Sequence, residues 1–79
     1  MNDIDKLEKW IKHYNPKFKK IFNFDMPHDI HGLDIYKLGE MISAPQAFSI
    51  NDFIIEKYGA EGYNLISEIL INGPYKKWG

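Results

Sequence analysis

The chain has no cysteine, and this absence limits its possible folds more than any residue that it contains. Without disulfides or thiolate metal sites, its 79 residues can be held together only by apolar packing or by a partner subunit. A chain of this length buries only about 60% of the surface that its unfolded form exposes, so its margin of stability is small. Because 44% of the residues are hydrophobic, the supply is sufficient for one core. We therefore expect a single domain over residues 1–79, with residues 73–79 as a tail.

Apolar residues recur at helical spacing near the N-terminus, whereas the alternation typical of strands is almost missing. At about 100° per residue, five of them form one stripe: Ile4, Leu7, Trp10, Ile11 and Tyr14. Asn2 or Asp3 can cap this first helix. Asn15 and Pro16 predict the end of this first helix. The same pair can cap and begin a short second helix over residues 17–22.

A third helix is predicted from Gly32 or Leu33 to Ile42. Apolar residues surround most of its circumference, so we expect it to be the most buried segment. The stretch before this helix contains Pro27 and is interpreted as loop or extended chain. Pro45 predicts another interruption after the helix, because proline disfavours helical backbone at the residue before it.

The last predicted helix has the clearest limits. Ser49, followed by Asp52, resembles a capping box at its start, and Asn-Gly-Pro at residues 72–74 predicts its end. One apolar stripe runs through the segment: Ile54, Ile55, Tyr58, Leu65, Ile66 and Ile69. Gly59 and Gly62 lie in or beside this stripe, where they would let a neighbouring backbone approach closely. Because the stripe continues across both glycines, we favour one long helix; the alternative is two helices hinged at Gly59.

The predicted fold is therefore all-α, a small compact bundle of about four helices of which the last is long. The tail carries Tyr75 and Trp78, which either fold back onto the core or are exposed. Residues 1–15 are too charged for a signal peptide, and no apolar run approaches the length of a membrane span. We therefore expect a cytoplasmic protein.

The charged residues restrict the possible partners. The chain has no arginine, so it lacks the planar fork that binds phosphate, carboxylate or guanine through two hydrogen bonds. Its net charge of −1 gives no overall attraction to nucleic acid or to anionic membranes. Lysines outnumber acidic residues within residues 1–20, and acidic residues outnumber lysines in the rest of the chain. We expect no membrane partner, and we favour protein over nucleic acid as the partner.

The stretch DMPHDIHGLD, residues 25–34, is the one segment that suggests a metal site. His28 and His31 are weak candidate ligands. A carboxylate could come from Asp25, Asp29 or Asp34. The spacing matches no established zinc signature, and an aspartate near residue 29 or 34 could instead cap the next helix. No serine lies in the context of a catalytic nucleophile. We expect no catalytic site, no cofactor and no enzymatic activity.

Five lysines of the N-terminal region suggest an alternative function, a nucleic-acid-binding regulator: Lys9, Lys12, Lys17, Lys19 and Lys20. Lysines would neutralise phosphates, and the aromatic residues between them could stack on bases if they were exposed. Helical spacing, however, places Trp10 and Tyr14 on the apolar stripe and predicts that the core needs them. The exposure of these two aromatic residues therefore distinguishes the two interpretations.

The leading hypothesis is a non-enzymatic protein-binding module. Its predicted surface is the acidic side of the last helix, which combines carboxylates with aromatic residues: Asp52, Phe53, Glu56, Tyr63 and Glu68. Such a surface suits a partner with a basic surface. Phe53 and Tyr63 could also pack against the tail or a second copy of the chain, and a homodimer would enlarge the small core. By analogy with antitoxins, immunity proteins and phage-encoded inhibitors, we expect an inhibitor or a mobile-element accessory protein that occupies a surface of its partner.

Overall fold

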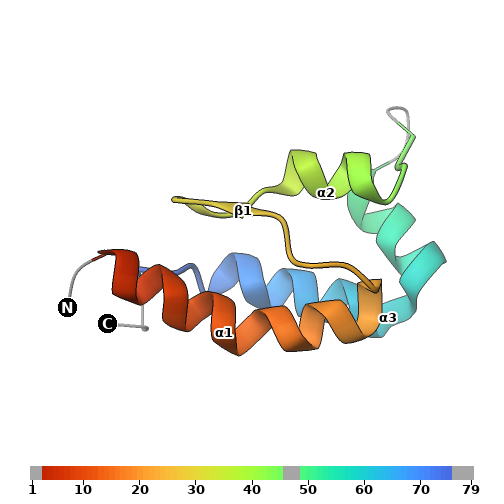
Figure 1. Cartoon of the computed structure of the whole chain (residues 1–79). Helices are drawn as coiled ribbons and strands as arrows, with labels where there is room; N and C mark the ends of the chain where they lie inside the picture. Colours follow the sequence, from red (N-terminus) through yellow and green to blue (C-terminus); the bar gives the residue numbers. More distant parts are fainter. Residues whose placement is uncertain (1–2, 46–48, 76–79) are drawn as a thin grey trace.

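The structure, a computed structural model, describes residues 3–45 and 49–75. Within these residues the chain forms three helices and one antiparallel hairpin: α1 (Asp3–Phe22), β1 (His28–Asp29), β2 (Gly32–Leu33), α2 (Ile35–Met41) and α3 (Ile50–Ile71). Figure 1 shows α1 and the C-terminal part of α3 side by side, with the hairpin and α2 on one side of this pair. The fold is mostly helical and compact, as predicted. The prediction of about four helices without strands is wrong, because α1 is not divided and a hairpin follows it.

Helix α1 continues through Pro16, where the sequence predicts a break. Proline removes one helical hydrogen bond and costs about 3 kcal/mol relative to alanine inside a helix. Four aromatic residues, spaced four apart, lie buried on one face of the helix: Trp10, Tyr14, Phe18 and Phe22. Burial of such a side chain is worth roughly 1.5–3 kcal/mol. A break at Pro16 would divide this row, so the packing of the row outweighs the local preference of the proline.

The side chain of Asn15 holds the chain that follows α1 and does not cap a second helix. Its Oδ1 accepts a hydrogen bond from the backbone N–H of Met26 at 2.7 Å, and its Nδ2 donates to Asp25 Oδ1 at 3.3 Å. Helix α1 ends where Asn23 adopts φ 68° and its N–H donates to the Lys19 carbonyl at 2.8 Å. Asparagine tolerates this left-handed backbone better than most residues.

The hairpin forms in the segment that the sequence identifies only as loop or extended chain. His28 pairs with Leu33, and Asp29 pairs with Gly32. Gly32 has φ +126°, and a Cβ at this residue would lie 3.2 Å from Pro74 Cδ. The Tyr75 hydroxyl donates to the Ile30 carbonyl. The described part of the tail thus folds back onto the hairpin, whereas Trp78 lies outside the described residues.

Helix α2 is shorter and more exposed than predicted. It begins after Asp34, whose Oδ1 accepts a hydrogen bond from the backbone N–H of Lys37 at 3.0 Å. At its C-terminus Ser43 has φ 60°, the Ser43 N–H donates to the Glu40 carbonyl, and the Ala44 N–H donates to the Gly39 carbonyl. These two bonds form a Schellman motif. Leu38 is the buried residue of the helix, so the expectation that this segment is the most buried one is wrong.

Helix α3 begins after Ser49 and ends before Asn72, as the sequence predicts, but it is broken at Gly59. The predicted capping box does not form, because the Ser49 side chain makes no cap hydrogen bond. This residue has φ 80° and ψ −179°, which is not helical backbone. We refer to residues 50–58 as the first segment of α3 and to residues 60–71 as its second segment. In Figure 1 the second segment lies along α1, whereas the first segment leans toward α2. The favoured prediction of one continuous helix is therefore wrong, and the alternative, a hinge at Gly59, is confirmed.

The core lies mainly between α1 and α3. It contains eleven buried apolar residues: Trp10, Tyr14, Phe18, Phe22, Met26, Leu38, Ile42, Ile54, Leu65, Ile66 and Ile69. Trp10 Nε1 donates to the Asn72 carbonyl at 2.7 Å, and the Tyr14 hydroxyl donates to Glu68 Oε1 at 3.2 Å. These bonds fix the C-terminal end of α3 against α1. Within the described residues, no helix combines the length and the apolarity that a membrane crossing requires.

Candidate protein-binding surface

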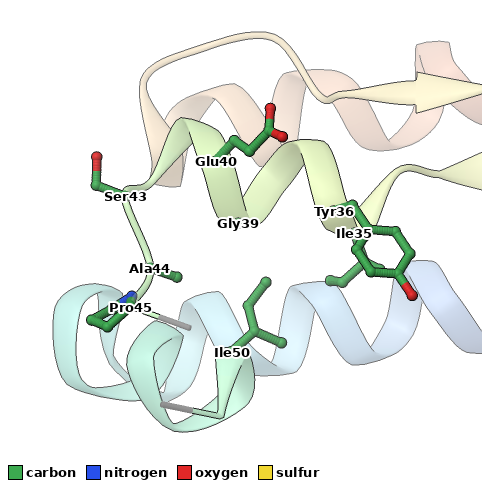
Figure 2. A pocket seen from close by; sticks show the side chains of 8 residues that line it. All are labelled: Ile35, Tyr36, Gly39, Glu40, Ser43, Ala44, Pro45 and Ile50. Carbon is green, nitrogen blue, oxygen red and sulfur yellow. The ribbon is translucent and has the colours of Figure 1, made fainter. Parts of the chain in front are cut away.

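A groove of about 540 Å³ lies between α2 and the beginning of α3. Eight residues line it: Ile35, Tyr36, Gly39, Glu40, Ser43, Ala44, Pro45 and Ile50. Figure 2 shows Ile50 pointing from α3 toward Gly39 on α2, whereas the polar ends of Glu40 and Ser43 point away from α3. Lys57 Nζ donates to the Ile42 carbonyl at 3.1 Å, which links the first segment of α3 to the end of α2. The interior of the groove is therefore apolar, and both of its walls are held in place.

Gly39 forms the part of the α2 wall that faces Ile50. A glycine inside a helix costs about 1 kcal/mol relative to alanine. Gly39 has no positive φ, and the nearest atom to a Cβ at this residue would be Ile50 Cδ1 at 3.4 Å, which is an ordinary van der Waals contact. Neither the backbone nor the packing of the fold thus requires glycine at this position. An alanine at this position would place its methyl group in contact with Ile50 Cδ1, between the two walls of the groove.

Tyr36 lies at the edge of the groove and is 85% exposed, the largest exposed fraction among the large hydrophobic residues of the described chain. Exposed tyrosines beside an apolar depression are typical of protein interfaces. The sequence does not single out Tyr36, because the apolar residues around the predicted helix suggest burial on all sides. The charged residues Lys37 and Glu40, one and four positions later, mark the solvent-facing side of α2 and could have identified it.

Asp52 and Glu56 of the predicted surface are exposed and one turn apart on the first segment of α3. Ile55 is 44% exposed on the same side, although the sequence assigns it to the buried stripe. At about 100° per residue, these three residues lie on a different side of the segment from Ile50 and Ile54. The break at Gly59 explains the error, because the buried side of the second segment does not extend straight into the first.

The other residues of the predicted acidic surface have roles inside the fold. Phe53 and Tyr63 are half-buried and pack against the core, so neither projects freely toward a partner. Glu68 is exposed, but its carboxylate accepts the hydrogen bond from Tyr14. Asp52 and Glu68 lie on opposite sides of the break at Gly59, in the two segments of α3.

The five lysines proposed for nucleic-acid binding are all exposed: Lys9, Lys12, Lys17, Lys19 and Lys20. The aromatic residues between them are not, since Trp10, Tyr14 and Phe18 are at most 1% exposed and cannot stack on bases. Two of the lysines, Lys17 and Lys20, line a second groove, of about 390 Å³, between α1 and α3. The same groove is lined by Glu61 and Glu68, so the structure brings part of the lysine face and part of the acidic face together.

The aspartates and histidines of residues 25–34 do not converge. His28 and His31 are exposed in the hairpin, and Asp29 Oδ1 accepts a hydrogen bond from the His31 backbone N–H at 2.7 Å. Asp34 caps α2, and Asp25 lies 3.8 Å from Lys19 Nζ. Among residues 3–45 and 49–75, no three histidine, aspartate or glutamate side chains are placed to hold a metal ion. Local backbone capping thus accounts for two of the three aspartates.

Two tyrosine hydroxyls have shifted pKa values. Burial raises the pKa of Tyr14 above its ordinary value of 10.0, and the neighbouring Glu68 carboxylate adds to the rise, while the hydrogen bond from the Asn72 amide opposes it. Burial also raises the pKa of Tyr58. Both hydroxyls belong to the core side of the helices and lie outside the groove, so these shifts concern stability.

Comparison of the chain with protein-family models, with curated proteins and with solved structures finds no match.

Proposed function

We propose that the chain acts by binding another protein in the groove between α2 and α3. The exposure of Tyr36 beside this groove is the observation that carries the proposal, because an exposed tyrosine at the edge of an apolar depression matches the composition of protein interfaces. Gly39 supports it, since glycine at this position costs helix stability although neither its backbone nor a close contact in the fold requires it. The groove would receive an apolar side chain of the partner, and Tyr36 would pack against the flank of that side chain.

The charge at the rim of the groove favours a partner with a basic residue beside this apolar anchor. Glu40 is the charged residue among those that line the groove, whereas Asp52 and Glu56 are exposed on a different side of the first segment of α3 from Ile50. Carboxylates at the rim of an apolar contact accelerate association with a basic partner and contribute less to the lifetime of the complex. We include inhibitors and accessory proteins in this proposal, because such a protein acts by occupying a surface of its target.

The test is quantitative capture of partners from a lysate of the host, with and without nuclease treatment, by three immobilised proteins. These are the wild type, Tyr36→Ala, and Lys12→Ala as a matched control on the exposed side of α1. We expect one protein to be retained by the wild type and the control, and recovered about tenfold less by Tyr36→Ala. Equal recovery by all three proteins would contradict the proposal. Recovery that disappears with nuclease and is reduced in Lys12→Ala would instead support the nucleic-acid alternative.

A further inference from the structure

Helix α3 is broken by a single residue whose backbone only glycine adopts readily. Gly59, with φ 80° and ψ −179°, lies in the region of positive φ and extended ψ that is essentially restricted to glycine. The residue is exposed, and a Cβ at this position would meet no atom within 4 Å. The space around Gly59 is thus open, and its backbone conformation alone disfavours a side chain at this position.

Gly62 gives a second, independent sign that the broken form depends on glycine. A Cβ at Gly62 would lie 2.8 Å from Tyr58 Cβ, a distance that real Cβ atoms do not tolerate. In a continuous helix, the Cβ atoms of residues four apart are about 5–6 Å apart, so the conflict would not exist. Both glycines therefore suit the broken helix, whereas both disfavour a straight one.

The apolar pattern of α3 nevertheless fits a straight helix. Its stripe continues across Gly59 and includes Ile55 together with Leu65, Ile66 and Ile69. In the broken helix Ile55 is 44% exposed, while the other three residues are buried. A straight α3 would bring Ile55 into line with them and would use the whole stripe.

One chain by itself cannot straighten α3 without losing its core. The second segment is bound to α1 through the Trp10 and Tyr14 hydrogen bonds, and the first segment carries Ile54, which has no exposed surface. Straightening would separate these two sets of contacts. A second copy of the chain can restore both, because its own α1 offers the same surface to the displaced segment.

We propose that α3 has two states, broken in the monomer and straight in a domain-swapped dimer in which its second segment packs against α1 of a second copy. The bonds from Trp10 to Asn72 and from Tyr14 to Glu68 then form between the chains and keep their geometry. The dimer retains the contacts of the monomer, removes the unusual backbone at Gly59 and aligns Ile55 with the buried stripe. This proposal is independent of the groove between α2 and α3 and of the proposed function.

The test compares two alanines of opposite chirality at residue 59, made by chemical synthesis. An L-alanine at this position disfavours positive φ and favours helix, whereas a D-alanine favours positive φ and holds the break. By sedimentation equilibrium, we expect the dissociation constant of the Gly59→Ala dimer to be at least about a hundredfold lower than that of the wild type. The D-alanine protein should remain a monomer of 9.3 kDa at every concentration.

The distance between nitroxide labels at Asn51→Cys and Asn64→Cys distinguishes a swapped dimer from two broken monomers lying side by side. The chain has no other cysteine, and both asparagines are exposed. In doubly labelled Gly59→Ala diluted with unlabelled protein, we expect an intrachain separation of about 20 Å, the length of a straight helix between these residues. The D-alanine protein should give a shorter distance.

Three results would overturn the proposal. The first is a Gly59→Ala protein that folds and stays monomeric at millimolar concentration. The second is a dimer whose intrachain distance equals that of the D-alanine protein, since its α3 would still be broken. If Gly59→Ala does not fold, Gly62→Ala takes its place, because its Cβ conflicts only with the broken form. The third result that would overturn the proposal is a Gly62→Ala protein that stays monomeric.

Discussion

Three of the six glycines in this chain differ in what their surroundings and their backbone require. At Gly32 a positive φ and the close approach of Pro74 exclude a side chain. At Gly59 the backbone again requires glycine, but the surrounding space is open. At Gly39 neither condition holds, and an added Cβ would make an ordinary contact with Ile50 Cδ1 in the groove. Gly32 thus supports the fold, Gly59 allows the break in α3, and Gly39 belongs to the candidate binding groove.

The position of Gly39 predicts a conflict between stability and binding. Gly39→Ala should raise the free energy of unfolding by about 1 kcal/mol, because alanine is the better helix former and its Cβ fits against Ile50. The same Cβ enters the groove, so the protein should retain less of the partner captured by the wild type. Urea denaturation measures the first effect and quantitative capture the second. A variant that is less stable, or that binds as well as the wild type, would contradict this role of Gly39.

Tyr14 predicts a loss of stability at alkaline pH. Its pKa is higher in the folded chain than the ordinary value of 10.0, because burial and the Glu68 carboxylate disfavour the phenolate. Because the pKa of Tyr14 is higher in the folded chain than in the unfolded chain, its contribution to stability is complete below the unfolded pKa. That contribution is lost as the pH rises from the unfolded pKa through the folded pKa. We expect the free energy of unfolding to decrease above about pH 10, and to decrease less steeply in Tyr14→Phe.

Urea titrations at successive pH values measure this slope. Tyr36→Phe is the matched control, because it removes a hydroxyl from the exposed side of α2. Equal slopes for Tyr14→Phe and Tyr36→Phe would show that Tyr14 does not cause the alkaline loss of stability.

At the level of the secondary-structure elements, packing decides where local signals conflict. Pro16 lies inside α1 because Trp10, Tyr14, Phe18 and Phe22 must share one face of a single helix. Conversely, Gly59 interrupts α3 although its apolar stripe is continuous. In both helices the arrangement of the core, and not the strongest local helix signal, determines whether the element continues.

Replacement of the proline inside α1 tests this balance. Pro16→Ala restores a backbone donor toward the Lys12 carbonyl and should raise the free energy of unfolding by about 2 kcal/mol, somewhat less than the full helix penalty because the unfolded chain also gains freedom. Urea denaturation measures the change. Pro45→Ala, outside any helix, is the control and should give no gain. An unchanged or lower stability of Pro16→Ala would show that the helix bears no cost at this residue.

Sequence patterns located the elements with clear end signals. Ser49 and Asn72 correctly mark the limits of α3, and Asp34 caps α2 as one interpretation of the aspartates allowed. The strands of the hairpin contain two residues each, too few to show any alternation. The break at Gly59 could not be decided from periodicity, because a stripe of side chains does not record a change in helix direction.

The candidate site was predicted less well than the fold. Asp52 and Glu56 are exposed as expected, but Phe53 and Tyr63 belong to the edge of the core. Tyr36 and Gly39 were not identified, because a groove depends on how α2 and the first segment of α3 lie against each other. No pattern within either segment encodes that arrangement.

At the scale of the whole molecule, the core and the candidate surface are separated. The contact between α1 and the second segment of α3 contains most of the buried aromatic and aliphatic residues, while α2 and the first segment of α3 enclose the groove. Figure 1 shows α1 beginning and α3 ending at the end of the molecule opposite to the first segment of α3. Substitutions in the groove can therefore change binding while the main core stays intact.

Site-specific photo-crosslinking at residue 36 tests the central claim most directly. A photoreactive phenylalanine analogue replaces Tyr36 in one protein and Lys12 in the other, both exposed in the structure. After irradiation in a nuclease-treated host lysate, mass spectrometry identifies the adducts. We expect one protein to be joined to residue 36 and not to residue 12, and an excess of unlabelled wild type to suppress the adduct. The absence of an adduct at residue 36, or the same adducts from both positions, would contradict a protein-binding site in this groove.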